Sequence, residues 1–171
     1  MTRPALALAT LLSLLAPASQ ALAYEDQLTL GLSAGYAHAP RATDSHGVVV
    51  DAAVGIGLDP VWTLRLRGGY GLHPGDQATH LGLATGELLY VIDVLEVVPY
   101  FGLGAGGLLA VADGGSTADA IAGPVVGADY LLSRELALSL DLRLKVRLTA
   151  LDDDPFYFVA AGGVVIFFDL Y

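Results

Sequence analysis

Apolar and polar side chains alternate with a period of two along most of the chain beyond residue 26. The pattern is strongest over residues 136–149, where every even-numbered position is Leu or Val. The odd-numbered positions include Asp141, Arg143, Lys145 and Arg147. A helix would scatter these charges and leucines over every face, whereas a strand gives one apolar and one charged side. The segment is therefore predicted to be a β-strand.

Seven further segments show the same alternation. It is clear over residues 26–37, 47–58 and 62–72. It is weaker over the glycine-containing segments 79–92, 97–112, 120–132 and 156–171, and which parity faces which side stays open there. A tilted strand that crosses a membrane needs about 9–11 residues, a length that these segments reach.

Composition decides what kind of β-protein this is. Hydrophobic residues make up 54% of the 171 residues and charged residues only 15%, against roughly 25% charged in a soluble domain. No 18-residue apolar window beyond Ala23 is free of charges or glycine clusters, so membrane helices are not expected. Because only helices and closed barrels satisfy their backbone in lipid, we predict an all-β, eight-stranded antiparallel up-and-down transmembrane β-barrel.

The first 23 residues have a different character. A positive start at Arg3 precedes an apolar run, and the segment ends Ala21-Leu22-Ala23. This order is typical of a secretory signal peptide. We expect residues 1–23 to be cleaved and residues 24–171 to form one exported barrel.

Charge and cysteine content exclude several functions. Eight Lys and Arg against 18 Asp and Glu give a net charge of −10, the wrong sign for a nucleic-acid-binding protein. The chain has no Cys, which excludes disulfides and thiolate chemistry.

The connections fall into two classes. Residues 38–46, 73–78, 112–119 and 150–155 are polar and are expected to be extracellular loops. Residues 59–60, 93–96 and 132–135 are tighter and are expected to be periplasmic turns. Aromatic residues lie near the predicted strand ends, as in the two interfacial girdles of outer-membrane barrels.

Three stretches resemble the small eight-stranded outer-membrane barrels of the OmpA-like and OmpX-like kind. They are the Pro-Tyr-x-Gly-x-Gly-x-Gly sequence at 99–106, the hairpin sequence 127–143, and the final segment 163–171, which ends on an aromatic residue. Asp169 departs from the family pattern, which has an apolar or aromatic residue there. The resemblance implies a monomer in the outer membrane, inserted by the barrel-assembly machinery and surrounded by outer-membrane lipids and lipopolysaccharide.

Charged residues on the polar parity are the first candidate site. The predicted set is Asp51, Arg65, Arg67, Glu87, Asp129, Asp141, Arg143, Lys145 and Arg147. An eight-stranded barrel is only wide enough for its own side chains, so these charges are expected to pair in a buried network. The alternative is a narrow pore whose excess of positive charge favours anions.

Other motifs suggest rival chemistry. His38, His46, His73 and His80 fall near the first two loops, with Ser45 and Asp76, as in a conceivable lipid A-modifying enzyme. Residues 152–154 are three aspartates that could attract a divalent cation. A G-x-G-x-x-G sequence at Gly102, Gly104 and Gly107 lacks a following helix, so it is interpreted as a coincidence.

We therefore expect a non-enzymatic barrel with a structural or surface-interaction role, without cofactor or metal. A soluble lipid-binding barrel is the rival fold. Its leucines would point inward and its charges outward.

Overall fold

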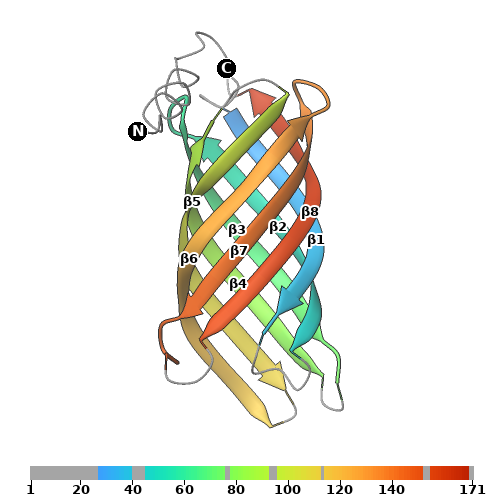
Figure 1. The fold of residues 1–171 in the computed structure, drawn as a ribbon, viewed down its shortest axis with the longest axis vertical. Helices are drawn as coiled ribbons and strands as arrows, with labels where there is room; N and C mark the ends of the chain where they lie inside the picture. Colours follow the sequence, from blue (N-terminus) through green and yellow to red (C-terminus); the bar gives the residue numbers. More distant parts are fainter. Residues whose placement is uncertain are drawn as a thin grey trace, which may run out of the picture.

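The computed structural model describes residues 27–39, 45–75, 78–92, 96–112, 114–151 and 155–169. Eight strands form one closed barrel in which each strand pairs with its neighbours in chain order and β1 closes onto β8 (Figure 1). All pairings are antiparallel. The strands are β1 (Gln27–His38), β2 (His46–Gly57), β3 (Trp62–His73), β4 (Thr79–Val91), β5 (Val97–Ala112), β6 (Gly115–Leu131), β7 (Leu136–Arg147) and β8 (Phe156–Asp169). The predicted eight-stranded up-and-down barrel is confirmed.

Several sequence features lie outside the described residues. They are the expected signal peptide 1–23, the aspartates 152–154, Asp76 and the final aromatic residue Tyr171. Among the residues that the structure describes, no helix is long and apolar enough to span a membrane.

Side chains alternate between an exposed outer wall and a buried interior. In β2, Val48 and Val50 are exposed, whereas Val49 and Asp51 are buried. Odd-numbered residues face the interior in β4, β6 and β8, and even-numbered residues do so in β5. The parities that the sequence left open are thereby assigned, and the leucine stripe of β7 lies on the outer wall.

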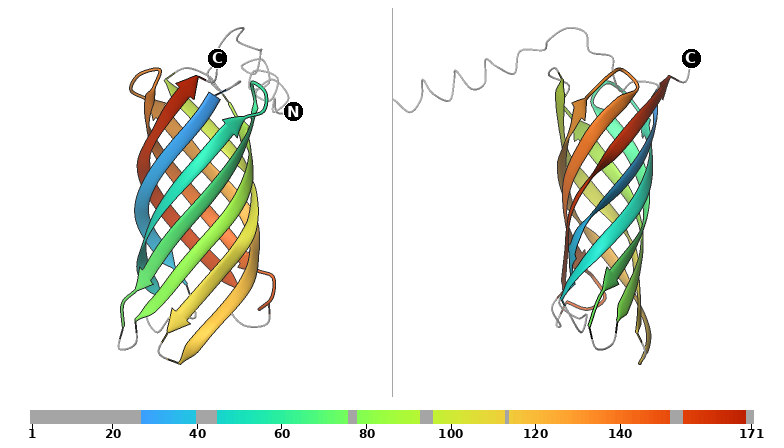
Figure 2. Two further views of the ribbon diagram at one scale, coloured as in Figure 1. Left: turned by 180° about the vertical axis from the view of Figure 1, so that it is seen from behind. Right: turned by 90° about the vertical axis from the view of Figure 1, so that its right-hand side faces the viewer.

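The largest departure from the predicted strands is in β6. This strand begins at Gly115 rather than at residue 120, so most of the expected loop 112–119 is strand. Ala112 pairs with Gly115 across a tight turn, and Gly115 has φ of 135°, a conformation that favours glycine. The β5–β6 hairpin consequently reaches beyond the neighbouring strands (Figure 2).

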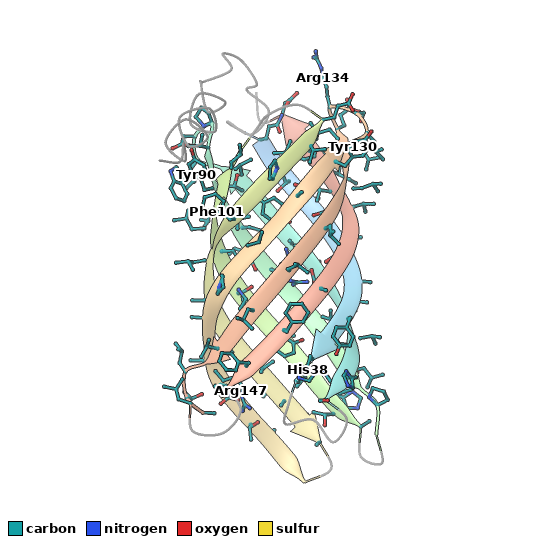
Figure 3. All side chains as sticks on the ribbon, in the orientation of Figure 1. His38, Tyr90, Phe101, Tyr130, Arg134 and Arg147 are labelled. Atoms are coloured by element: carbon teal, nitrogen blue, oxygen red, sulfur yellow. The ribbon has the colours of Figure 1, made fainter. Side chains whose placement is uncertain are left out.

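The two ends of the barrel differ. We call the end that carries both ends of the described chain the terminal end, and the opposite end, with the β1–β2, β3–β4, β5–β6 and β7–β8 connections, the loop end (Figure 1). On the outer wall, the rings of Trp62 and Tyr90 lie 5.3 Å apart and those of Tyr90 and Phe101 5.4 Å apart, near the terminal end (Figure 3). Tyr36 and Tyr70 lie on the outer wall towards the loop end, so aromatic residues border both ends of the apolar wall.

The interior contains two separate apolar clusters. The terminal cluster comprises Leu89, Val91, Val98, Tyr100, Val125, Ala137 and Phe167. The loop-end cluster comprises Ala37, Ala39, Val49, Leu81, Leu108, Ile121, Tyr157, Val159 and Ala161. Charged side chains fill the interior between them.

Candidate functional site: the charged lumen and the loop-end vestibule

Seven buried charged side chains pair with one another in the middle of the barrel and are called the charged layer: Asp51, Arg65, Arg67, Glu87, Asp141, Arg143 and Lys145. Arg67 lies at the centre of this layer. Its guanidinium pairs with Asp51 and lies 3.0 Å from Asp141 Oδ2 and 3.5 Å from Glu87 Oε1. These three carboxylates come from β2, β7 and β4. One cation on β3 thus connects strands on opposite sides of the barrel.

Further cations complete the layer. Arg143 Nη2 lies 2.8 Å from Asp51 Oδ2, and Arg143 Nε lies 2.8 Å from Asp141 Oδ1. Arg65 Nε lies 2.7 Å from Glu87 Oε2, and Lys145 Nζ lies 3.9 Å from Glu87 Oε1. Each carboxylate therefore faces at least two cations, which offsets part of the cost of burying these charges.

Neutral groups also contact the layer. The Ser33 hydroxyl donates to Asp51 Oδ1 at 2.6 Å. The Arg65 guanidinium carbon lies 5.1 Å from the centre of the Tyr100 ring, at the border of the terminal cluster. The charged layer is thus packed directly against the terminal cluster.

Arg147 belongs to a separate pair at the loop end. It forms an ion pair with Asp119, whose other carboxylate oxygen accepts a hydrogen bond of 2.7 Å from the Thr149 hydroxyl. Asp119 was expected in a loop and was not among the predicted lumen charges. The alternation of β6, continued from Ile121 to position 119, was the signal that could have placed it inside.

The last predicted lumen residue, Asp129, is buried on β6 next to Ser139 of β7. With it, the described interior contains five cations, Arg65, Arg67, Arg143, Lys145 and Arg147, and five carboxylates, Asp51, Glu87, Asp119, Asp129 and Asp141. The formal charges therefore balance. The prediction of excess positive charge in the lumen, on which the anion-selective pore was based, is therefore wrong for the described residues.

Three cavities follow one another along the interior. Two small ones, of about 40 and 20 Å³, lie on either side of Arg67. A third, of about 340 Å³, lies at the loop end between residues of β4, β5, β6, β7 and β8, and we call it the vestibule. Tyr157 lines both the vestibule and the 20 Å³ cavity, so its ring separates the two.

The histidines do not form one site. His38, His46 and His80 lie on outward-facing positions, whereas His73 is completely buried in the interior. His46 Nδ1 lies 2.5 Å from the Tyr36 hydroxyl, and His80 Nδ1 lies 2.5 Å from the Tyr70 hydroxyl. Among the described residues, no three His, Cys, Asp or Glu side chains are grouped as a metal site.

Gly102, Gly104 and Gly107 are all within β5, which is followed by the β5–β6 hairpin. Gly104 faces the interior, where an added Cβ would come within 2.6 Å of Lys145 Nζ and 2.9 Å of Glu87 Cγ. The glycine makes room for these side chains. No described helix follows the motif, as a dinucleotide site would require.

Solved structures of small outer-membrane proteins have a similar fold. Neisserial surface protein A has a TM-score of 0.66 and 15% identity, over 82% of this chain and 95% of that one. OprG of Pseudomonas aeruginosa has a TM-score of 0.61 and 11% identity, over 85% and 97%. Ail, the attachment invasion locus protein of Yersinia pestis, solved with the heparin analogue sucrose octasulfate, has a TM-score of 0.55 and 11% identity, over 84% and 99%.

The resemblance to small eight-stranded outer-membrane barrels is confirmed at the level of the fold. No protein-family model matches the chain. No curated protein matches it either.

Proposed function

We propose that this protein is a non-enzymatic outer-membrane barrel with a closed lumen, which acts in the envelope as a structural or surface-exposed element. The observation that carries the proposal is the three-layered interior, with apolar, charged and apolar layers stacked along the barrel axis. Ions crossing it would have to break buried ion pairs and pass two apolar clusters.

The outer wall supports placement in a membrane. Large apolar side chains such as Leu32, Leu66 and Leu140 are more than 60% exposed. A soluble protein rarely exposes an apolar surface that extends around the whole molecule. With the charges inside, a soluble barrel that holds a lipid among inward-facing leucines is disfavoured.

Cell fractionation with gel mobility tests the membrane assignment. The protein should be found in the outer-membrane fraction and should change mobility on an SDS gel only after boiling, because a closed barrel resists SDS in the cold. Recovery in the soluble periplasm, without a mobility change, would contradict it.

Conductance separates the closed barrel from the pore. Purified protein in planar bilayers should give no stepwise current. Phe167→Gly and Val98→Gly together remove side chains from the terminal cluster, and the double variant should still give no stepwise current because the charged layer remains closed. Steady wild-type channels that are altered by Arg143→Ala would establish the pore instead.

An enzyme acting on lipid A is the second alternative that the sequence raised. We expect the lipid A mass spectrum of cells that express the protein to be unchanged. A new lipid A species that is lost with His46→Ala would overturn the non-enzymatic part of the proposal.

A further inference from the structure

We propose that the vestibule is a binding site for a small, uncharged and largely apolar molecule that enters from the loop end. This goes beyond a structural role, and its test does not depend on whether the lumen conducts. Ligand sites are typically concave, mostly apolar and of about 300–1,000 Å³, with a few polar groups. At about 340 Å³ the vestibule lies within this range.

The volume arises from small side chains at the mouth of the barrel. Ala39, Ala110 and Ala112 face the vestibule where larger residues would fill it. Leu81, Leu108 and the Tyr157 ring provide larger apolar surfaces. The cavities beside the charged layer measure only about 40 and 20 Å³, so among the described interior cavities the one large enough for an organic molecule lies at the loop end.

The charges around the vestibule favour an uncharged ligand. Among its described lining residues, Arg147 is the single charged one, and its guanidinium is already paired with Asp119. A carboxylate or ammonium ion entering the vestibule would lose hydration without gaining an unpaired opposite charge.

Polar groups are nevertheless available for orientation. Thr79 of β4 and Thr117 of β6, both on inward-facing positions, place hydroxyls around the rim. Tyr157, only 1% exposed, contributes its ring to the lining, so the two threonines are the hydroxyl groups that a ligand can reach. A ligand with an apolar body and one or two hydroxyl, carbonyl or N–H groups therefore fits this lining.

The inner end of the vestibule favours binding of a ligand over its passage through the barrel. On the inner side of Tyr157 lie the 20 Å³ cavity and the charged layer, both too restricted for an organic molecule. A ligand taken up from outside would remain at the loop end.

The test uses indole as the neutral probe, with indole-3-acetate and tryptamine as its anionic and cationic counterparts. The full mature barrel, ¹⁵N-labelled and placed in phospholipid nanodiscs, is titrated while backbone amide shifts are recorded. Indole should shift the amides of Ala110 and Thr117 in a saturable manner. The charged analogues should bind at least tenfold more weakly.

Two matched tryptophan variants locate the site. Ala110→Trp fills the vestibule and should weaken indole binding at least tenfold. Ala120→Trp places the same side chain on the outer wall of β6 and should leave binding unchanged. Thr117→Trp, nearer the rim, provides a second filling variant if Ala110→Trp fails the SDS-gel test for folding.

Two results would overturn the proposal. Linear shifts that are equal at inward residues and at the outward-facing Ala34, and that persist in both filling variants, would mean that indole only dissolves in the bilayer. Tighter binding of either charged analogue would refute the assignment to an uncharged ligand.

Discussion

At the scale of single residues, Arg67 pairs with more carboxylates than any other described cation of the lumen. It contacts carboxylates on three other strands, and its side chain is only 7% exposed. Removing its charge leaves Asp51, Glu87 and Asp141 with fewer cations while all three carboxylates stay buried from water. Uncompensated buried charge is among the most destabilising changes known for single substitutions.

Arg67→Met keeps most of the side-chain volume and removes the charge. We expect it to lower the free energy of unfolding by about 3–5 kcal/mol. Urea titration of the barrel in lipid vesicles measures this. Arg134→Met, at an exposed turn of the terminal end, is the matched control and should change stability by less than about 0.5 kcal/mol. Equal stability of the two variants would show that the charged layer is dispensable.

The sequence pattern indicated an inward parity for most of the lumen charges, missed Asp119, and did not indicate how the charges pair. The alternation of β3 and β7 already placed Arg65, Arg67, Arg143 and Lys145 on one parity. Their partners come from strands up to 92 residues away, for example Asp51 with Arg143. Pairing across the lumen depends on the stagger between strands, which alternation alone does not specify.

At the scale of elements, the β5–β6 hairpin differs most from the rest of the barrel. Residues 115–120 of β6 pair with β5, whereas the ladder with β7 begins at Ile121 opposite Arg147. Apart from the Leu148 N–H, which donates to the Ala120 carbonyl, no described strand pairs with this edge over residues 115–119. The tip is held by fewer backbone hydrogen bonds than the middle of the barrel.

We expect amide hydrogen exchange to show this difference. Amides of residues 115–119 that point away from β5 should exchange at least about 100-fold faster than those of residues 138–142, which are paired with β6 and with β8. Exchange measured by NMR in nanodiscs gives the comparison. Uniform protection along β6 would mean that another part of the chain covers this edge.

The start of β6 was missed because its composition is that of a loop. Gly115, Ser116 and Thr117 are small or polar, and they follow a second glycine. What makes them a strand is the pairing with β5, a contact that local pattern does not reveal. The parity of β5 was open for a related reason, since Leu108 faces inward and its neighbour Leu109 outward.

At the scale of the whole molecule, the barrel has its charges inside and its apolar side chains outside. Leu66 is 63% exposed near the middle of β3, and Leu58 is 56% exposed just beyond the end of β2. If the wall faces lipid, a charge should be costly at the first position and tolerated at the second.

Leu66→Arg should accordingly destabilise the barrel folded in a bilayer by about 2–4 kcal/mol, and Leu58→Arg by about 0–1 kcal/mol. The measurement is reversible folding into vesicles, followed by tryptophan fluorescence. A neutral or stabilising Leu66→Arg would indicate that the outer wall faces water.

The layered interior also constrains the order of assembly. The carboxylates and cations that meet around Arg67 come from early strands, β2, β3 and β4, and from β7, near the end of the chain. The pairs among β2, β3 and β4 join neighbouring strands, whereas those with Asp141 and Arg143 of β7 form once the β1–β8 seam brings the sheet round on itself. Before that, an unclosed sheet in hydrocarbon would expose incompletely paired ions to the lipid chains. Insertion and seam closure must therefore advance together, with the charged centre remaining hydrated until the last strands are in place.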